Sequence, residues 1–176
     1  PEKARFYMKK AGQLDHTFNL HSAEAAFGGA TDAAILIKEH AKKAGIKINV
    51  VREPSDGYWS NVWMKKEWCM CYWGGRPVED MMFSVAYADG APWNDTHWKN
   101  KRFNELLVAA RAELNTEKRR RLYYDMQEIC SNDGGTVVPM FNQMVTANNS
   151  KKVAHGPISG HMAMDGMRIH ERWWMA

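Results

Sequence analysis

The chain has 176 residues, of which 45% are hydrophobic and 25% are charged. These proportions are typical of a globular domain with a buried core, and they distinguish the chain from a disordered tail. The 24 lysine and arginine residues exceed the 20 acidic residues by only four, which is too mild an excess to predict a nucleic-acid partner. No run approaches the ~20 consecutive apolar residues that a membrane span needs.

The first fifty residues alternate between helical and strand-like patterns. The predicted order is a helix over 2–11, a strand around 18–20, a helix over about 32–44 and a strand over 46–50. Thr31 or Asp32 is the expected N-cap of the second helix, and Gly45 is placed to end it in the left-handed conformation. This order predicts a βαβ-like unit.

The remaining elements follow from the spacing of aromatic and apolar residues. Trp59 and Trp63 are four residues apart and predict a short helix over 58–66, with the two rings packing against each other. Two later helices are expected to form a hairpin around Asn115 and Thr116. The other predicted elements are a strand over 67–73, a helix over 78–87, a polar and aromatic loop over 88–96, helices over 103–114 and 117–130, and extended runs over 136–141 and 143–148.

Regular spacing ends after Asn149. The tail, residues 150–176, combines glycines with apolar residues that need another surface to lie against. It is therefore expected to be a connection to a part of the protein outside this chain. The chain also opens at Pro1 directly into a helical pattern, so we expect a piece of a longer protein.

The candidate binding site lies where the predicted strand ends at Trp73 and continues into Gly74 and Gly75. In open α/β sheets a ligand lies beyond the carboxyl ends of the strands, and glycines let the backbone approach it closely. Arg76 comes next and is the single cation of this stretch. Its guanidinium offers a planar fork for a carboxylate or a phosphate.

Each of these candidates has an ordinary structural alternative. Arg76 could instead form a surface ion pair with Glu79 or Asp80, just downstream. Trp73 and Trp93 could stack on a ligand or belong to the core. Asn94 could donate or accept a hydrogen bond with the ligand or with its own loop, and both possibilities stay open.

Cysteine and histidine residues raise the alternative of a metal-dependent or thiol enzyme. Candidate ligands are Cys69, Cys71, His97, His155, His161 and His170. Their spacing matches no metal motif, and the sequence has neither a Gly-x-Ser-x-Gly elbow nor a glycine-rich phosphate loop. We therefore predict neither a metal nor a cofactor, and the alternative rests on Cys69 and Cys71.

The basic run Lys118–Arg121 belongs to a helix whose other side is apolar. Such a run is typical of a solvated helix face. It does not predict a nucleic-acid interface.

Several segments together resemble a known family. In chain order they are KKAGIKINV, the strand that ends in Trp and Gly, NDTHW, KNKRFNELLVAARAELNTEKRRRLYYDMQEI and GGTVVPMFNQ. The sequence resembles the carboxyl-terminal lobe of the extracytoplasmic solute-binding proteins of peptide and nickel ABC importers, known as family 5. The resemblance covers roughly residues 2–149 and is most specific over 102–141.

This resemblance implies an α/β lobe of the periplasmic-binding-protein kind, with a mixed sheet flanked by helices, in a two-lobed clamp. Residues 1–149 would form the lobe, and 150–176 would return toward a missing amino-terminal lobe. The implied function is capture of a peptide or similar small organic solute in the periplasm, without catalysis, for an ABC permease in the membrane.

The resemblance also bears on the type of ligand. In relatives that bind peptides, an aspartate shortly after the strand-ending tryptophan clamps the amino group of the ligand. Here that position holds Arg76, which favours an anionic group instead. Glu79 or Asp80 could still accept a cation, although this is the less favoured expectation.

Overall fold

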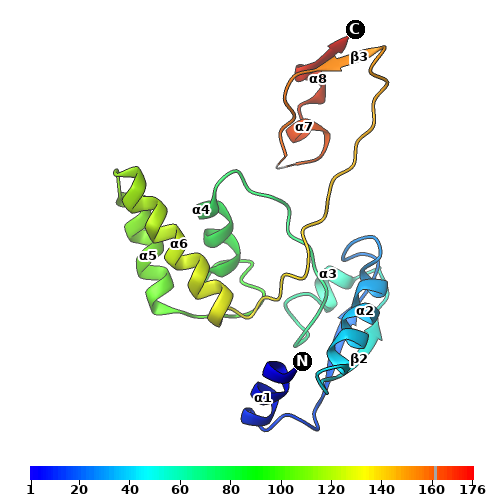
Figure 1. Cartoon of the computed structure of the whole chain (residues 1–176), viewed down its shortest axis with the longest axis vertical. Helices are drawn as coiled ribbons and strands as arrows, with labels where there is room; N and C mark the ends of the chain where they lie inside the picture. The colour runs from blue at the N-terminus through cyan, green and yellow to red at the C-terminus, as the bar shows by residue number, and fades with distance from the viewer. Residues whose placement is uncertain (161) are drawn as a thin grey trace. The chain divides into compact units, whose positions relative to one another are not determined.

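The computed structural model of the chain describes residues 1–160 and 162–176 (Figure 1). The chain divides into two compact units, Pro1–Trp73 and Gly74–Ala176. None of the described helices is both long and apolar enough to cross a bilayer.

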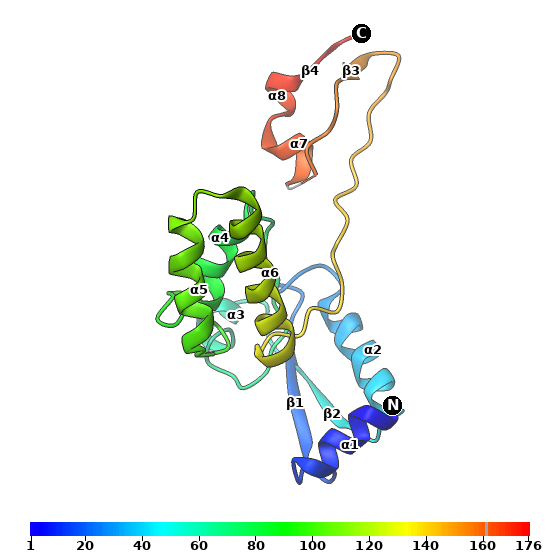
Figure 2. The same cartoon turned by 60° about the vertical axis from the view of Figure 1, so that its left-hand side comes forward.

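The first unit is built on a parallel pair of strands. Its elements are α1 (Glu2–Lys10), β1 (Thr17–Ser22), α2 (Ala30–Lys42), β2 (Lys47–Arg52) and α3 (Tyr58–Asn61). Thr17 pairs with Lys47 at one end of the ladder and Ser22 with Arg52 at the other, and Figure 2 shows the two strands side by side. The βαβ unit predicted from the sequence is therefore present.

Apolar side chains from these elements form the core of the first unit. They are Leu20, Ala23, Ala26, Ala30, Ala34, Ile48, Tyr58, Val62 and Met70. The Tyr58 hydroxyl donates to the Met70 carbonyl at 2.6 Å and lies 3.3 Å from the His21 carbonyl. Burial raises the pKa of this hydroxyl, so it stays a donor.

Three local predictions in this unit are wrong. Thr31 or Asp32 was predicted as the N-cap of α2, but neither is. Instead, the Glu24 carboxylate accepts hydrogen bonds from the backbone N–H groups of Gly29 and Thr31 at the start of this helix. The helix predicted over 58–66 extends only over Tyr58–Asn61. No strand forms over the predicted range 67–73. This segment pairs with β1 only through a single bridge between Cys69 and His21.

The second unit contains a helical cluster. Its elements are α4 (Glu79–Met82), the π-helix η1 (Phe83–Tyr87), α5 (Lys101–Ala112) and α6 (Thr116–Asp133). Asn100 caps α5 and Asn115 caps α6, each through its side-chain oxygen. The hairpin predicted from apolar spacing is present, with a core of Phe83, Phe103, Leu106, Leu107, Ala110 and Met126.

The two extended runs predicted over 136–141 and 143–148 form no strand. A strand needs a ladder partner for its backbone groups, and the described residues supply none here. Large apolar side chains of this segment are exposed, including Phe141 and Val145, each 92% accessible.

The tail holds more regular structure than a simple connection. Strands β3 (Val153–His155) and β4 (Trp173–Met175) pair antiparallel, with α7 (Ala163–Met167) and α8 (Ile169–Arg172) between them. The buried Asp165 carboxylate accepts from Ser159 N at 2.6 Å, Arg172 Nε at 2.8 Å and Trp173 Nε1 at 3.1 Å. These bonds join the loop, the helix and the second strand.

Candidate ligand-binding site

Arg76 lies back against the glycine pair that precedes it. Its Nη1 donates to the Gly74 carbonyl at 2.8 Å and to the Gly75 carbonyl at 3.3 Å. A Cβ added at Gly74 would lie 3.5 Å from the same nitrogen, which is an ordinary contact. The glycine pair therefore positions the guanidinium through its carbonyl groups.

An open depression of about 350 Å³ lies beside Arg76. It is lined by Arg76, Pro77, Val78, Glu79 and Met82. Glu79 and Met82 are three residues apart and share one face of α4. The depression thus combines a cation, a carboxylate and apolar surface, which suits a small organic molecule with a charged group.

Asp80 belongs to a different face of α4. Arg111 of α5 donates to both of its carboxylate oxygens, from Nε at 2.8 Å and from Nη2 at 3.2 Å. The Tyr123 hydroxyl of α6 adds a third bond at 3.2 Å. Hydrogen bonds from Arg111 hold the pKa of Asp80 below its usual value. The Asp80 carboxylate is thus bound by Arg111 and Tyr123 of the neighbouring helices.

Arg111 and Tyr123 were not predicted from the sequence as partners of Asp80. They lie 31 and 43 residues from Asp80, so no local spacing connects them to it. One signal is visible in retrospect, because Arg111 follows Leu107 by four residues and borders the apolar face of its helix.

Asn94 is buried and is fully hydrogen-bonded within its own loop. Its amide nitrogen donates to the Ala88 carbonyl at 3.2 Å and to the Trp98 carbonyl at 2.7 Å. Its side-chain oxygen accepts from the Trp98 N–H at 3.2 Å and from the Thr96 hydroxyl at 3.3 Å. An asparagine amide has two donor hydrogens and two acceptor lone pairs, so the loop uses all four.

The two tryptophans of the predicted site lie in different units. Trp73 ends the first unit and is half-buried, whereas the other five predicted residues belong to the second. Trp93 is 46% exposed, and its backbone N–H donates to the Val85 carbonyl at 3.3 Å. Trp59 and Trp63 pack edge to face at 5.8 Å between ring centroids, as predicted.

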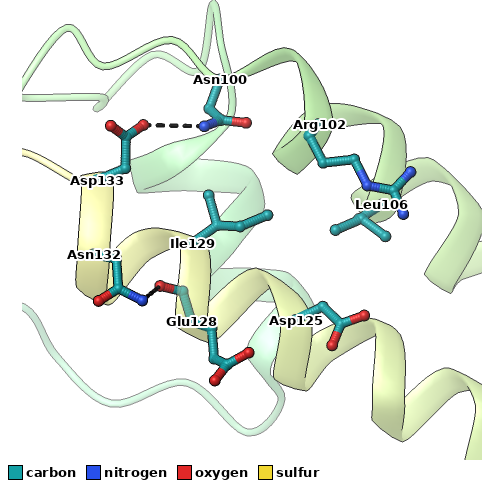
Figure 3. Close-up of a pocket in the computed structure, with 8 residues that line it drawn as sticks. All are labelled: Asn100, Arg102, Leu106, Asp125, Glu128, Ile129, Asn132 and Asp133. Carbon is teal, nitrogen blue, oxygen red and sulfur yellow. Dashed lines mark hydrogen bonds between the residues drawn. The ribbon is translucent and has the colours of Figure 1, made fainter.

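A second depression, of about 420 Å³, lies between α5 and α6 (Figure 3). It is lined by Asn100, Arg102, Leu106, Asp125, Glu128, Ile129, Asn132 and Asp133. Asp133 accepts from Asn100 Nδ2 at 3.0 Å and from Trp98 Nε1 at 3.1 Å, and these bonds lower its pKa. None of the residues predicted to bind ligand lies in this depression.

The histidine and cysteine side chains that were candidate metal ligands do not cluster in the part of the chain that the structure describes. No group of three or more histidine, cysteine, aspartate or glutamate side chains there could hold a metal ion. Cys69, Cys71 and Cys130, all within the described residues, form no disulfide, and burial raises the pKa of Cys130 to about 12. His161 lies outside the described residues.

Three arginines of the basic run in α6 contact residues that are near them in the sequence. Arg120 pairs with Glu117 at 3.4 Å and Arg121 with Asp125 at 2.9 Å. Arg119 Nη1 donates to the Glu113 carbonyl at 3.1 Å. These contacts fit the predicted solvated helix face.

The sequence matches no protein-family model, and no curated protein matches it. Its fold does match solved structures. NikZ from Campylobacter jejuni in complex with Ni(L-His) is 21% identical, with a TM-score of 0.54 over 65% of this chain and 24% of NikZ. AppA, a putative peptide-binding protein from Clostridium difficile, is 22% identical, with a TM-score of 0.64 over 75% of this chain and 28% of AppA.

A third match is DppA from Helicobacter pylori, an ABC transporter-associated periplasmic binding protein in complex with the peptide STSA. It is 20% identical, with a TM-score of 0.61 over 75% of this chain and 27% of DppA. The chain spans about a quarter of the length of these structures. The comparisons therefore confirm the predicted fold: the chain has the α/β fold found in part of the substrate-binding proteins of ABC transporters.

Proposed function

We propose that this chain is part of the substrate-binding component of an ABC importer and captures a peptide or similar small organic solute in the periplasm. The observation that carries this proposal is the match of its fold to NikZ, AppA and DppA. DppA holds a peptide and NikZ holds Ni(L-His), so both kinds of cargo occur on this fold. The role is binding without catalysis.

Arg76 is the proposed contact for an anionic group of the ligand. It lies at the edge of the open depression, beside the apolar Val78 and Met82. Asp80 forms an ion pair with Arg111 and does not line the depression, so it is not proposed to bind a cation of the ligand. Gly74, Gly75, Trp73, Trp93 and Asn94 complete the proposed set, with Asn94 shaping its loop. A carboxylate is the group that best matches a guanidinium fork.

The proposed partners are an ABC permease in the membrane and an amino-terminal lobe of the same protein. Exposed apolar side chains at 137–145 and in the tail, residues 150–176, support the second partner, since monomers rarely leave large apolar patches uncovered. Ligand would favour a closed form of the two lobes because it contacts both. No nucleic acid is involved in this proposal.

The test is calorimetric titration of the full-length protein with trialanine and with trialanine amide, which lacks the terminal carboxylate. Arg76→Ala should weaken trialanine binding about tenfold or more, as expected for a lost charge-assisted hydrogen bond. Binding of the amide should change little.

The paired control is Cys69→Ala combined with Cys71→Ala, which should leave trialanine binding unchanged. The alternative hypothesis, a metal-dependent or thiol enzyme domain using Cys69 and Cys71, predicts the reverse. Loss of function in the cysteine variant with no effect of Arg76→Ala would overturn the proposal.

A further inference from the structure

The short helix α4 has two chemically different faces. One face carries Glu79 and Met82, which line the depression beside Arg76. The other carries Asp80, and four residues later Ser84 in η1, which contact α5 and α6. Figures 1 and 2 both show α4 beside these two helices. Contacts that hold Asp80 and Ser84 in place therefore also determine where Glu79 and Met82 lie.

The four-residue helix α4 cannot fix its own orientation, because isolated helices of this length are unstable in water. Its N-cap residue, Val78, makes no side-chain cap hydrogen bond. The π-helix that follows it is a rare geometry, found mostly as a single turn, and adds no long helical segment to support α4. The position of Glu79 and Met82 must therefore come from contacts outside α4.

Those contacts converge on Asp80. Arg111 grips its carboxylate with two nitrogens at 2.8 and 3.2 Å and also donates to the Ser84 hydroxyl. Ser84 in turn donates to the Asp80 carbonyl at 2.5 Å, and Tyr123 donates to the carboxylate at 3.2 Å. Side chains from α5 and α6 thus hold the first turn of α4 and the start of η1 together.

Apolar packing supports the same face. The Phe83 ring lies 5.2 Å from Phe103 and 6.3 Å from Tyr123 between centroids, the second pair being stacked. Packing of this kind limits how far α4 can move away, whereas the bidentate fork limits how it rotates. Rotation is the motion that would remove Glu79 and Met82 from the depression.

We infer that Arg111 is a positioning residue for the proposed ligand site: through its fork on Asp80 it orients α4, so that Glu79 and Met82 face the depression beside Arg76. Arg111 acts at a distance and does not touch the ligand. This inference rests on the proposed function for its effect on binding, and on the geometry of α4 for its effect on structure.

The experiment measures two properties of the full-length protein: amide hydrogen exchange of residues 79–87 and affinity for trialanine. Arg111→Met and Asp80→Asn should each speed exchange in this segment about three- to tenfold, the range expected for loss of one partly exposed ion pair. Each should weaken trialanine binding by a similar factor. The double variant should be no worse than either single variant, because both remove the same contact.

Arg111→Lys should lie between the wild type and Arg111→Met, since it keeps the charge and loses the fork. The matched control is Arg121→Met, which removes an arginine–aspartate pair, 2.9 Å long, from α6 without touching α4. It should change neither the exchange of 79–87 nor the affinity.

Unchanged exchange in Arg111→Met would overturn the inference, whatever the ligand. Faster exchange with unchanged trialanine affinity would also overturn it, because α4 would then be held for a reason unrelated to binding. If the wild type binds neither trialanine nor its amide, the proposed peptide ligand fails, and the exchange result still decides whether Arg111 holds α4.

Discussion

Two segments of the second unit each bond a polar side chain to their own backbone, but only one of them places that side chain beside an open depression. The loop that contains Asn94 buries this residue, which is 6% exposed and makes four side-chain hydrogen bonds to its own loop. The segment that contains Arg76 places its guanidinium beside an open depression. The difference shows that a polar residue in such a loop can be assigned to ligand binding only once the hydrogen bonds within its own loop are known.

The largest effect that separates the two loops is expected for Asn94→Ala. Removing the buried amide takes the hydrogen-bond partner from the Trp98 N–H and from the Trp98 carbonyl, whereas the Ala88 carbonyl keeps its bond from the Ala91 N–H. This loss costs about 2 to 3 kcal/mol of unfolding free energy. Urea unfolding measures this loss. Asn94→Asp should also lose stability, because it replaces the donor nitrogen with a charged oxygen that faces the Ala88 and Trp98 carbonyls. A wild-type midpoint for Asn94→Ala would show that the loop does not depend on the amide.

A smaller effect, dependent on pH, is expected for Asp80→Asn, in the helix that follows the Arg76 segment. The pKa of Asp80 in the folded chain lies below its usual value of 3.8, chiefly because of Arg111. Its stabilisation of about 1 kcal/mol is therefore complete above about pH 5 and is lost as the pH falls through the folded pKa.

Urea unfolding of the wild type and of Asp80→Asn at a series of pH values measures this dependence. The two curves should separate at neutral pH and converge in acid. A separation that stays constant down to about pH 2 would contradict the assignment to Asp80.

The smallest effect on stability is expected for Arg76→Ala. Arg76 donates to the carbonyls of Gly74 and Gly75 in a partly exposed segment, and a substitution at such a position should change the unfolding free energy by no more than about 0.5 kcal/mol. Thermal unfolding without ligand tests this. A loss as large as that of Asn94→Ala would make Arg76 a structural residue and remove the contrast between the loops.

The sequence predicted what depends on local spacing. The apolar repeat that includes Phe103, Leu107 and Ala110 predicted α5, and the polar Asn115 marked the turn into α6. The order of two glycines and a cation was readable in the sequence, but the strand expected to end at Trp73 is absent, because residues 67–73 pair with β1 at Cys69 alone.

Features that depend on distant partners were not predictable. The fork of Arg111 on Asp80 connects residues 31 apart. The segment 136–148 has strand-like composition, yet strand formation needs a partner that composition does not specify. The Glu24 cap escaped notice because it reaches forward five residues to Gly29 instead of occupying the cap position itself.

The most direct test of the account is native mass spectrometry of the full-length protein as purified, followed by denaturation to release whatever it carries. We expect a peptide or another anionic organic solute, in keeping with Arg76 as the ligand contact. A stoichiometric metal ion with no organic molecule would contradict the account and would direct attention to the cysteine and histidine residues instead.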